Sequence, residues 1–184
     1  MSLSEFLAWE ERQELRYEFD GFQPVAMTGG TLGHDAITFN LRKALDAQLA
    51  GSKCRPFGPN VKILTGGRVR YPDAVISCTR QRPDATILES PVVVFEVVSE
   101  STSRTDRIEK VREYQNVPSI QRYIILEQDN VGATVFERKG NVWRAFTLIE
   151  GDMMHIPEIG IQLPLAECYM GVELPRHTER DARE

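Results

Sequence analysis

The spacing of apolar residues predicts helices and strands in alternation along the chain. Ser2 and Glu5 form a capping box, which predicts a first helix from Leu3 to about Gln13. Asp20-Gly21 separates two short apolar stretches, 17–19 and 22–27, and this arrangement is typical of a β-hairpin. A second helix is predicted before Gly51 because apolar residues recur there at helical spacing, namely Ile37, Leu41, Ala44, Leu45 and Leu49.

The rest of the chain predicts a sheet interrupted by one more helix. Apolar runs bounded by turn residues predict strands at 61–64, 69–71, 73–77, 92–98, 122–126, 131–138 and 142–148. A third helix is expected from about Asp106 to Gln115, because Ser103 or Thr105 can cap it and Pro118 ends it. This order predicts an α/β or α+β fold, with a mixed central sheet flanked by helices and preceded by an N-terminal helix and hairpin.

Length and composition limit the possible protein classes. The chain has 184 residues, 41% of them hydrophobic and 27% charged, which is typical of one globular domain. We expect that domain at residues 1–174 and a disordered tail at 175–184. The strongest apolar run, Pro91 to Val98, is far shorter than the ~20 residues that span a bilayer. Because the N-terminus also lacks a secretory apolar region, we expect a cytoplasmic protein that does not cross membranes.

The three cysteines give no sign of a metal site. Cys54, Cys78 and Cys168 are odd in number and widely spaced, with no CxxC motif and no flanking histidine. Such a set fits neither a disulfide framework nor a zinc site. The sequence therefore predicts three small, buried thiols.

Charge is unevenly distributed along the chain. The net charge of −5 argues against nucleic acid as a partner, yet residues 42–82 contain nine basic side chains and only two acidic ones. Such a segment is compatible with a surface that faces phosphates. The alternative is an ordinary solvated face.

Two acids stand where acids are costly. Asp73 follows Pro72 at the start of an apolar strand, and Glu96 lies within the apolar run 92–98. A buried carboxylate must be paired, protonated or bound to a metal, so a salt bridge to an arginine is one explanation for Glu96. If the two strands are neighbours, however, the two carboxylates can converge on Mg²⁺, which takes one or two carboxylates and keeps waters for a phosphate substrate. The second Pro-Asp pair, at Asp84, lies in a polar stretch and predicts only a turn.

An ordered set of motifs around these acids carries a resemblance to a known family. The set comprises Arg70-Tyr71-Pro72-Asp73, Phe95-Glu96-Val97-Val98-Ser99 with Ser101-Thr102, and Asp106-Arg107 followed by Lys110 and Tyr114, together with Tyr17-Glu18-x-x-Gly21, Gly33-His34 and Leu163-Pro164-Leu165. It resembles the Uma-two family of the PD-(D/E)xK nuclease superfamily over nearly the whole chain. The resemblance implies a restriction-endonuclease-like core and hydrolysis of phosphodiester bonds that depends on Mg²⁺ or Mn²⁺.

The resemblance also implies roles for individual residues. Asp73 and Glu96 match the two metal-binding acids, but Val98 stands where the superfamily has its lysine. Lys110 matches the family's own lysine on the following helix and is the first candidate to replace it, with Lys62 second. For Lys110 the alternative is an exposed helix residue beside Glu109 and Glu113.

Further positions are candidates for the same site. Glu18 matches an early glutamate of the family, and it is either a third carboxylate at the metal or a hairpin charge facing solvent. His34 is either a structural residue near the start of a helix or a residue that contacts a phosphate or orients a water. Arg70 and Lys62 are further candidates to contact the substrate phosphate. Ser99 and Thr102 are expected to shape the turn after the glutamate strand, and Tyr114 is expected in the core.

Three functions remain open from the sequence. The first is an endonuclease acting on nucleic acid, with DNA as the expected substrate and a homodimer as the expected form for cutting both strands. The second is a nuclease fold that binds nucleic acid or a protein without cutting, which the missing lysine at Val98 favours. The third, a small-molecule enzyme with a carboxylate pair, has no cofactor motif or nucleophile to support it.

Overall fold

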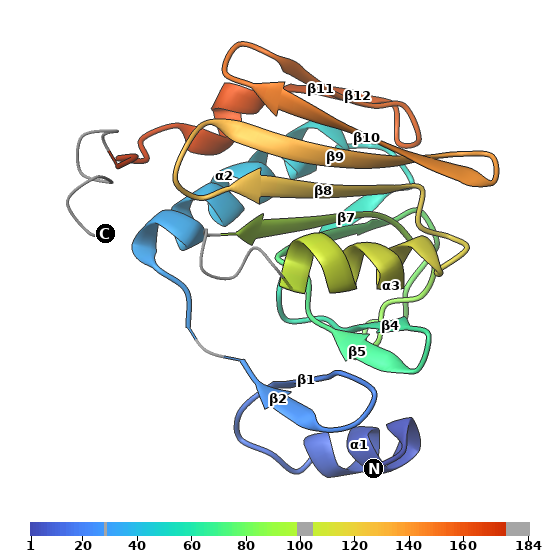
Figure 1. Cartoon of the computed structure of the whole chain (residues 1–184). Helices are drawn as coiled ribbons and strands as arrows, with labels where there is room; N and C mark the ends of the chain where they lie inside the picture. The colour runs from blue at the N-terminus through green and yellow to red at the C-terminus, as the bar shows by residue number, and fades with distance from the viewer. Residues whose placement is uncertain (28, 99–104, 176–184) are drawn as a thin grey trace.

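A six-stranded sheet forms the centre of the molecule, with strand order β10-β9-β8-β7-β6-β3 (Figure 1). This computed structural model describes residues 1–27, 29–98 and 105–175. β7 and β8 pair in parallel and the other neighbours pair antiparallel, so the sheet is mixed, as predicted. Its strands are β3 (Arg55–Phe57), β6 (Ala74–Ser77), β7 (Pro91–Val98), β8 (Arg122–Glu127), β9 (Gly132–Lys139) and β10 (Val142–Ile149).

Helices cover both faces of this sheet, which explains the continuous apolar run of β7. One face packs against α2 (Leu32–Gln48), the hairpin of β11 (Met153–Ile156) and β12 (Ile161–Pro164), and the 3₁₀ turn Leu165–Tyr169. The other face packs against α3 (Val111–Gln115), which continues from a π-helical turn at Thr105–Lys110. Alternate β7 residues therefore enter different cores: Phe95 faces α2, whereas Val94 and Val98 face α3.

A second, four-stranded sheet joins the N-terminal elements to the middle of the chain. Its order is β2 (Pro24–Ala26), β1 (Tyr17–Phe19), β5 (Arg68–Arg70) and β4 (Ile63–Thr65). Phe6 of α1 (Leu3–Glu10) stacks on Phe19, with ring centroids 4.8 Å apart, and both pack with Val69 and Tyr71. This sheet brings residues near position 18 to residues near position 70.

The structure departs from several of the predicted elements. The first helix ends at Glu10 rather than near Gln13, because the amides of Arg12 and Gln13 bond three residues back and tighten the chain into a turn. β3 was not predicted, since it is short and contains Pro56, a residue that sheets accept at their edges. The hairpin of β11 and β12 was also not predicted.

Two of the three cysteines form a disulfide, so the prediction of three thiols is wrong. β3 pairs antiparallel with β6, with Arg55 opposite Ser77, and this places Cys54 beside Cys78, to which it is bonded. The bridge depends on β3, the strand that the sequence did not reveal. Cys168 is a free and buried thiol, and burial raises its pKa to about 12.

The expectations for the turn after the glutamate strand and for the C-terminal tail concern residues that the structure does not describe. Ser99, Thr102 and residues 176–184 of the expected tail lie outside the described residues. Among the residues that are described, no helix is long and apolar enough to cross a membrane.

Candidate active site

The two acids singled out by the sequence lie beside each other on neighbouring strands. β6 and β7 pair antiparallel with Ala74 opposite Phe95, and Asp73 and Glu96 come directly next to this pair. Their side chains are 14% and 6% exposed, so both carboxylates lie largely out of water. The Oδ2 atom of Asp73 accepts a hydrogen bond of 2.7 Å from the backbone amide of Val97, which fixes Asp73 across the end of the pair.

His34 approaches Asp73 from the first turn of α2. Thr31 caps this helix by accepting a hydrogen bond of 3.1 Å from the His34 amide. The His34 Nε2 atom lies 3.1 Å from Asp73 Oδ2. This hydrogen bond raises the pKa of His34 against the opposing effect of burial, and the negative charges of Asp73, Glu96 and Asp35 add to the increase.

Glu96 receives two hydrogen bonds from the α3 side of the sheet. Lys110 Nζ lies 2.9 Å from Glu96 Oε1, and the hydroxyl of Tyr114 donates to the same oxygen at 2.9 Å. Burial raises the pKa of Tyr114 well above its usual value, and the charge of Glu96 acts in the same direction. Lys110 is only 9% exposed, so the alternative of an exposed helix residue is wrong. Val98 is buried in the core beneath α3, and its side chain contributes no charge.

Glu18 reaches the same ammonium group from the second sheet. Its Oε1 atom lies 3.7 Å from Lys110 Nζ and accepts a hydrogen bond of 3.1 Å from the Tyr71 amide. Its Oε2 atom accepts one of 3.0 Å from Arg70 Nη1. With its side chain 15% exposed and these three partners, Glu18 is not a hairpin charge facing solvent.

Arg70 is held in place by a buried ion pair with Glu113. Arg70 Nε and Nη2 donate to the two carboxylate oxygens of Glu113, each at 2.7 Å, and the side chains are 4% and 2% exposed. Burial opposes the charge of Arg70, but the hydrogen bonds to Glu113 and the charge of Glu18 outweigh it and raise the Arg70 pKa. Thr65 also donates to Glu113, at 3.2 Å.

Six of the seven candidate residues fall into two groups on these neighbouring strands, namely Asp73 with His34, and Glu96 with Lys110, Glu18 and Arg70. One candidate belongs to neither group. Lys62 is buried but forms an ion pair with Glu10, which also accepts a hydrogen bond from the Tyr71 hydroxyl. Lys62 is therefore committed to a separate cluster and not to the carboxylates of Asp73 and Glu96. Nothing in the sequence distinguishes Glu10 or Glu113 as buried partners, and only the structure reveals what each acid contacts.

The acids offer a small set of metal ligands. Asp73 and Glu96 supply carboxylate oxygens, and within the described residues no group of three or more His, Cys, Asp or Glu side chains is arranged to hold an ion. Two carboxylates suit Mg²⁺, which completes its coordination with waters and phosphate oxygens. They do not suit a structural zinc site, which is closed by four protein ligands.

A sequence model of the Uma2 family, described as "Putative restriction endonuclease", matches residues 3–166, which is most of the chain and includes every residue of this site. The chain belongs to the Uma2 family. It is 28% identical over 176 residues to an uncharacterized Synechocystis protein, slr1290, covering 94% of this chain and 93% of that protein. A second uncharacterized Synechocystis protein, sll1609, is 22% identical over 163 residues, covering 85% of this chain and 91% of that protein.

A solved structure agrees with this family at the level of the fold. The crystal structure of "a putative nuclease belonging to DUF820" from Anabaena variabilis matches with a TM-score of 0.76 and 16% identity, covering 94% of this chain and 99% of that one. This Uma2 chain therefore has the mixed-sheet, nuclease-like fold that the sequence predicted.

Proposed function

We propose that this Uma2 protein is a metal-dependent endonuclease that hydrolyses phosphodiester bonds of DNA. The observation that carries the proposal is the hydrogen bond of 2.9 Å between Lys110 and Glu96. Although Val98 occupies the strand position of the superfamily lysine, a lysine from the following helix brings its ammonium group to the strand glutamate. The cation that the motif requires is therefore available from a different element.

Asp73 and Glu96 would hold Mg²⁺ or Mn²⁺, and Glu18 would act on the site through Lys110, whose Nζ lies 3.7 Å from Glu18 Oε1. When bound, the ion would lower the pKa of a coordinated water and stabilise negative charge on the scissile phosphate. Such an ion is supported by the position of two largely buried carboxylates next to the same residue pair of neighbouring strands.

The basic residues around the acids would position the reactants. Lys110 would orient the attacking water or offset charge that develops on the phosphate, an effect worth several kcal/mol at preorganised sites. His34 would hold Asp73 through its Nε2 contact and face the phosphate from the start of α2. Arg70 would act indirectly, as a positioning residue. Its guanidinium binds Glu113 and Glu18 and so holds Glu18 towards Lys110.

Thermal unfolding with Mn²⁺ or Mg²⁺ tests the metal assignment without knowledge of the DNA target. A hundredfold excess of ion over its Kd adds about 2.7 kcal/mol to the free energy of unfolding. We expect the wild type to show the shift and Asp73→Asn to lose it. Asp84→Asn is the matched control, since Asp84 also follows a proline but pairs with Arg82 at the surface. A wild type without a shift, or an Asp73→Asn variant that keeps it, would contradict the assignment.

Cleavage then tests the reaction itself. With a pool of plasmid and linear DNA, we expect Mn²⁺-dependent cutting that EDTA abolishes and that Lys110→Met reduces by orders of magnitude. Lys110→Met should still show a metal-induced shift, because it leaves both metal-binding acids in place. Cutting that persists in EDTA would refute the proposed mechanism.

A second candidate function is a nuclease fold that binds nucleic acid without cutting it. The observation in its favour is Val98, which is 2% exposed and sealed in the apolar core. This function predicts DNA binding that is insensitive to EDTA, no metal-induced shift, and no cleavage under any metal. The two assays above separate it from the nuclease.

A further inference from the structure

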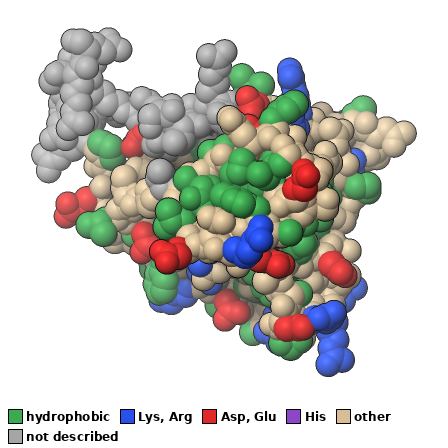
Figure 2. Space-filling view, turned by 90° about the horizontal axis from the view of Figure 1, so that it is seen from below, with side chains coloured by type: hydrophobic (Ala, Val, Ile, Leu, Met, Phe, Trp, Pro, Cys, Tyr) green, Lys and Arg blue, Asp and Glu red, His purple; other side chains and the backbone are tan. Residues whose placement is uncertain are grey.

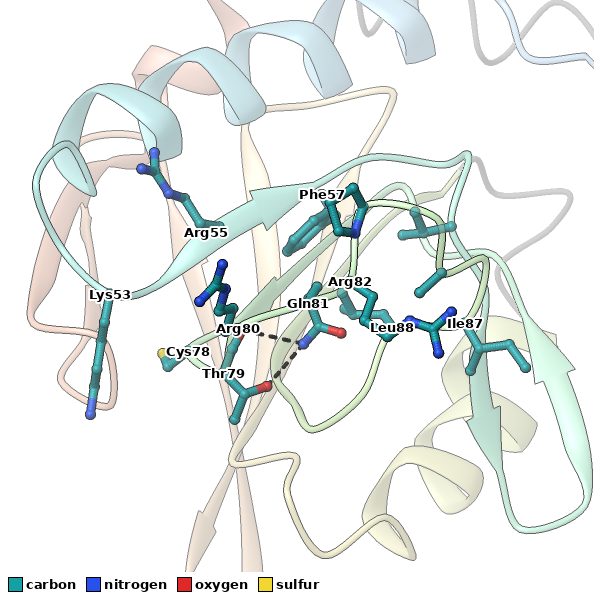
Figure 3. Close-up of a pocket in the computed structure, with 13 residues that line it drawn as sticks. Lys53, Arg55, Phe57, Cys78, Thr79, Arg80, Gln81, Arg82, Ile87 and Leu88 are labelled. Carbon is teal, nitrogen blue, oxygen red and sulfur yellow. Dashed lines mark hydrogen bonds between the residues drawn. The ribbon is translucent and has the colours of Figure 1, made fainter.

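A pocket with a basic rim lies at the opposite end of β6 from Asp73. Its volume is about 620 Å³, within the range of ligand-binding cavities. Lys53, Arg55, Arg80 and Arg82 contribute to its lining, and none of the described lining residues is acidic. Figure 3 shows Arg80 beside Gln81, with Arg55 and Phe57 on the strand above them, whereas Lys53 extends away from the other labelled residues.

Among the described residues, three of these four cations have no acidic side chain as an ion-pair partner. Arg82 pairs with Asp84, with Nη2 and Oδ2 2.6 Å apart. In the part of the chain that the structure describes, no ion pair involves Lys53, Arg55 or Arg80, and all three are exposed. Three such cations around one concavity create a positive field that favours an anion.

The segment that carries the pocket is held in a fixed shape. Cys78, which lines it, is bonded to Cys54, so the bridge joins the start of β3 to the end of β6. The Gln81 amide donates to the buried Ser77 hydroxyl at 3.0 Å and to the Glu89 carbonyl at 3.0 Å, and Gln81 Oε1 accepts from the Glu89 amide at 3.1 Å. These contacts reduce the entropy cost of ordering Arg80 around a ligand.

The floor of the pocket is apolar and contains an aromatic ring. Phe57 and Leu88 line it and belong to the same core cluster as Val94 and Val98. An aromatic ring beside positive charge is the arrangement with which proteins bind single-stranded nucleic acid, because bases stack on the ring while cations contact phosphates. On the face seen from below, by comparison, Figure 2 shows acidic and basic side chains interspersed around hydrophobic ones.

We propose that this basic pocket binds one nucleotide unit of a nucleic-acid strand, with its phosphate at Arg55 and Arg80 and its base against Phe57. The proposal deepens the proposed function and rests on it for the identity of the ligand. Asp73 and Cys78, the first lining residue after β6, are five residues apart, so the pocket begins about 17 Å along the strand from Asp73 at ~3.4 Å per residue. That length corresponds to about five nucleotides at ~3.4 Å per nucleotide of one strand, so one strand could contact both sites.

Fluorescence anisotropy of a labelled single-stranded oligonucleotide, measured in EDTA, tests the pocket independently of metal and cleavage. We expect Arg55→Gln/Arg80→Gln to weaken binding at least tenfold and to lower the salt dependence of log Kd by about 1.4, at ~0.7 per phosphate contact. Arg12→Gln/Arg144→Gln is the matched control, because it removes the same charge from exposed positions outside the pocket lining. The control should change the Kd less than twofold, and unfolding midpoints should match for all three proteins.

Equal binding by the pocket variant and the control variant would overturn the proposal. So would a mononucleotide that binds this pocket as tightly as the oligonucleotide, since the pocket would then hold a free nucleotide. The two proposals fail separately. Loss of the pocket's role leaves the Mn²⁺ shift unchanged, whereas failure of the nuclease proposal removes that shift while oligonucleotide binding still depends on Arg55 and Arg80.

Discussion

The buried pair of Arg70 and Glu113 offers a strong test of how the site is held together. We consider Arg70→Met, which keeps a side chain of similar length and removes the guanidinium. Glu113, whose side chain is 2% exposed, would lose both of its 2.7 Å hydrogen bonds from Arg70. Glu18 would lose its 3.0 Å hydrogen bond and keep the Tyr71 amide and Lys110.

The expected loss in the free energy of unfolding follows from the burial of Glu113, which Arg70→Met leaves without its main partner. Breaking a buried ion pair from one side costs about 3–5 kcal/mol, because the remaining charge stays in a poorly solvated place. Arg68, 39% exposed and 3.5 Å from Glu113, can partly compensate, so we expect about 3 kcal/mol. For a domain of this size that loss lowers Tm by roughly 6–12 °C. Replacing both partners, as in Arg70→Met/Glu113→Leu, should recover most of it.

Urea and thermal unfolding of the single and double variants measure these effects. Arg82→Met is the control, because Arg82 and Asp84 form an ion pair with side chains 80% and 70% exposed, and its loss should leave the unfolding midpoint unchanged. If Arg70→Met is as stable as Arg82→Met, the buried pair of Arg70 and Glu113 does not stabilise the fold. If the double variant is less stable than the single one, the cost does not arise from the stranded charge of Glu113.

Three further outcomes can be checked by unfolding. Leu45→Ala should lower the free energy of unfolding by about 2–5 kcal/mol, since Leu45 is fully buried against the sheet. Leu15→Ala is the comparison, because Leu15 is 61% exposed and its truncation should change the free energy of unfolding little. Cys54→Ser should lower the free energy of unfolding by about 3 kcal/mol, because the bridge joins residues 24 apart in sequence and restricts the unfolded chain. A reductant should lower the free energy of unfolding of the wild type by the same amount. Unchanged urea midpoints would contradict this prediction. Tyr114→Phe should lower the free energy of unfolding by about 1.5–3 kcal/mol in the absence of metal, because it removes a hydrogen bond to charged Glu96. A variant as stable as the wild type would contradict the presence of that hydrogen bond.

The sequence located the acids of the candidate site because their surroundings made them costly. Glu96 interrupts a strand of valines that is buried on both faces, and Asp73 opens an apolar strand. Since sequence neighbours already indicate burial, a carboxylate at either position needs a partner. The position of Lys110 followed from the family resemblance and not from burial, and the structure adds its contact with Glu96.

The partners of those acids could not be predicted in the same way. Glu113 lies in a five-residue helix beside other charged residues, and nothing in its neighbours distinguishes it from the exposed Glu109. Its burial depends on β4 and β5 coming to lie against α3, a tertiary contact between segments more than 40 residues apart. The disulfide escaped prediction for the same reason, because it depends on an edge strand of three residues that contains a proline.

The contacts within the site also indicate how an ion would have to bind. Asp73 already has His34 and the Val97 amide, Glu96 has Lys110 and Tyr114, and Glu18 has Arg70. Because these partners already satisfy the acids, we expect the chain to fold without a metal, in contrast to small domains whose structural zinc supplies the folding energy. An ion at Asp73 and Glu96 would compete with His34 and Lys110 for carboxylate oxygens. Its affinity would therefore be lower than the charge of the acids alone suggests, and an ammonium group displaced from Glu96 would be available to a phosphate.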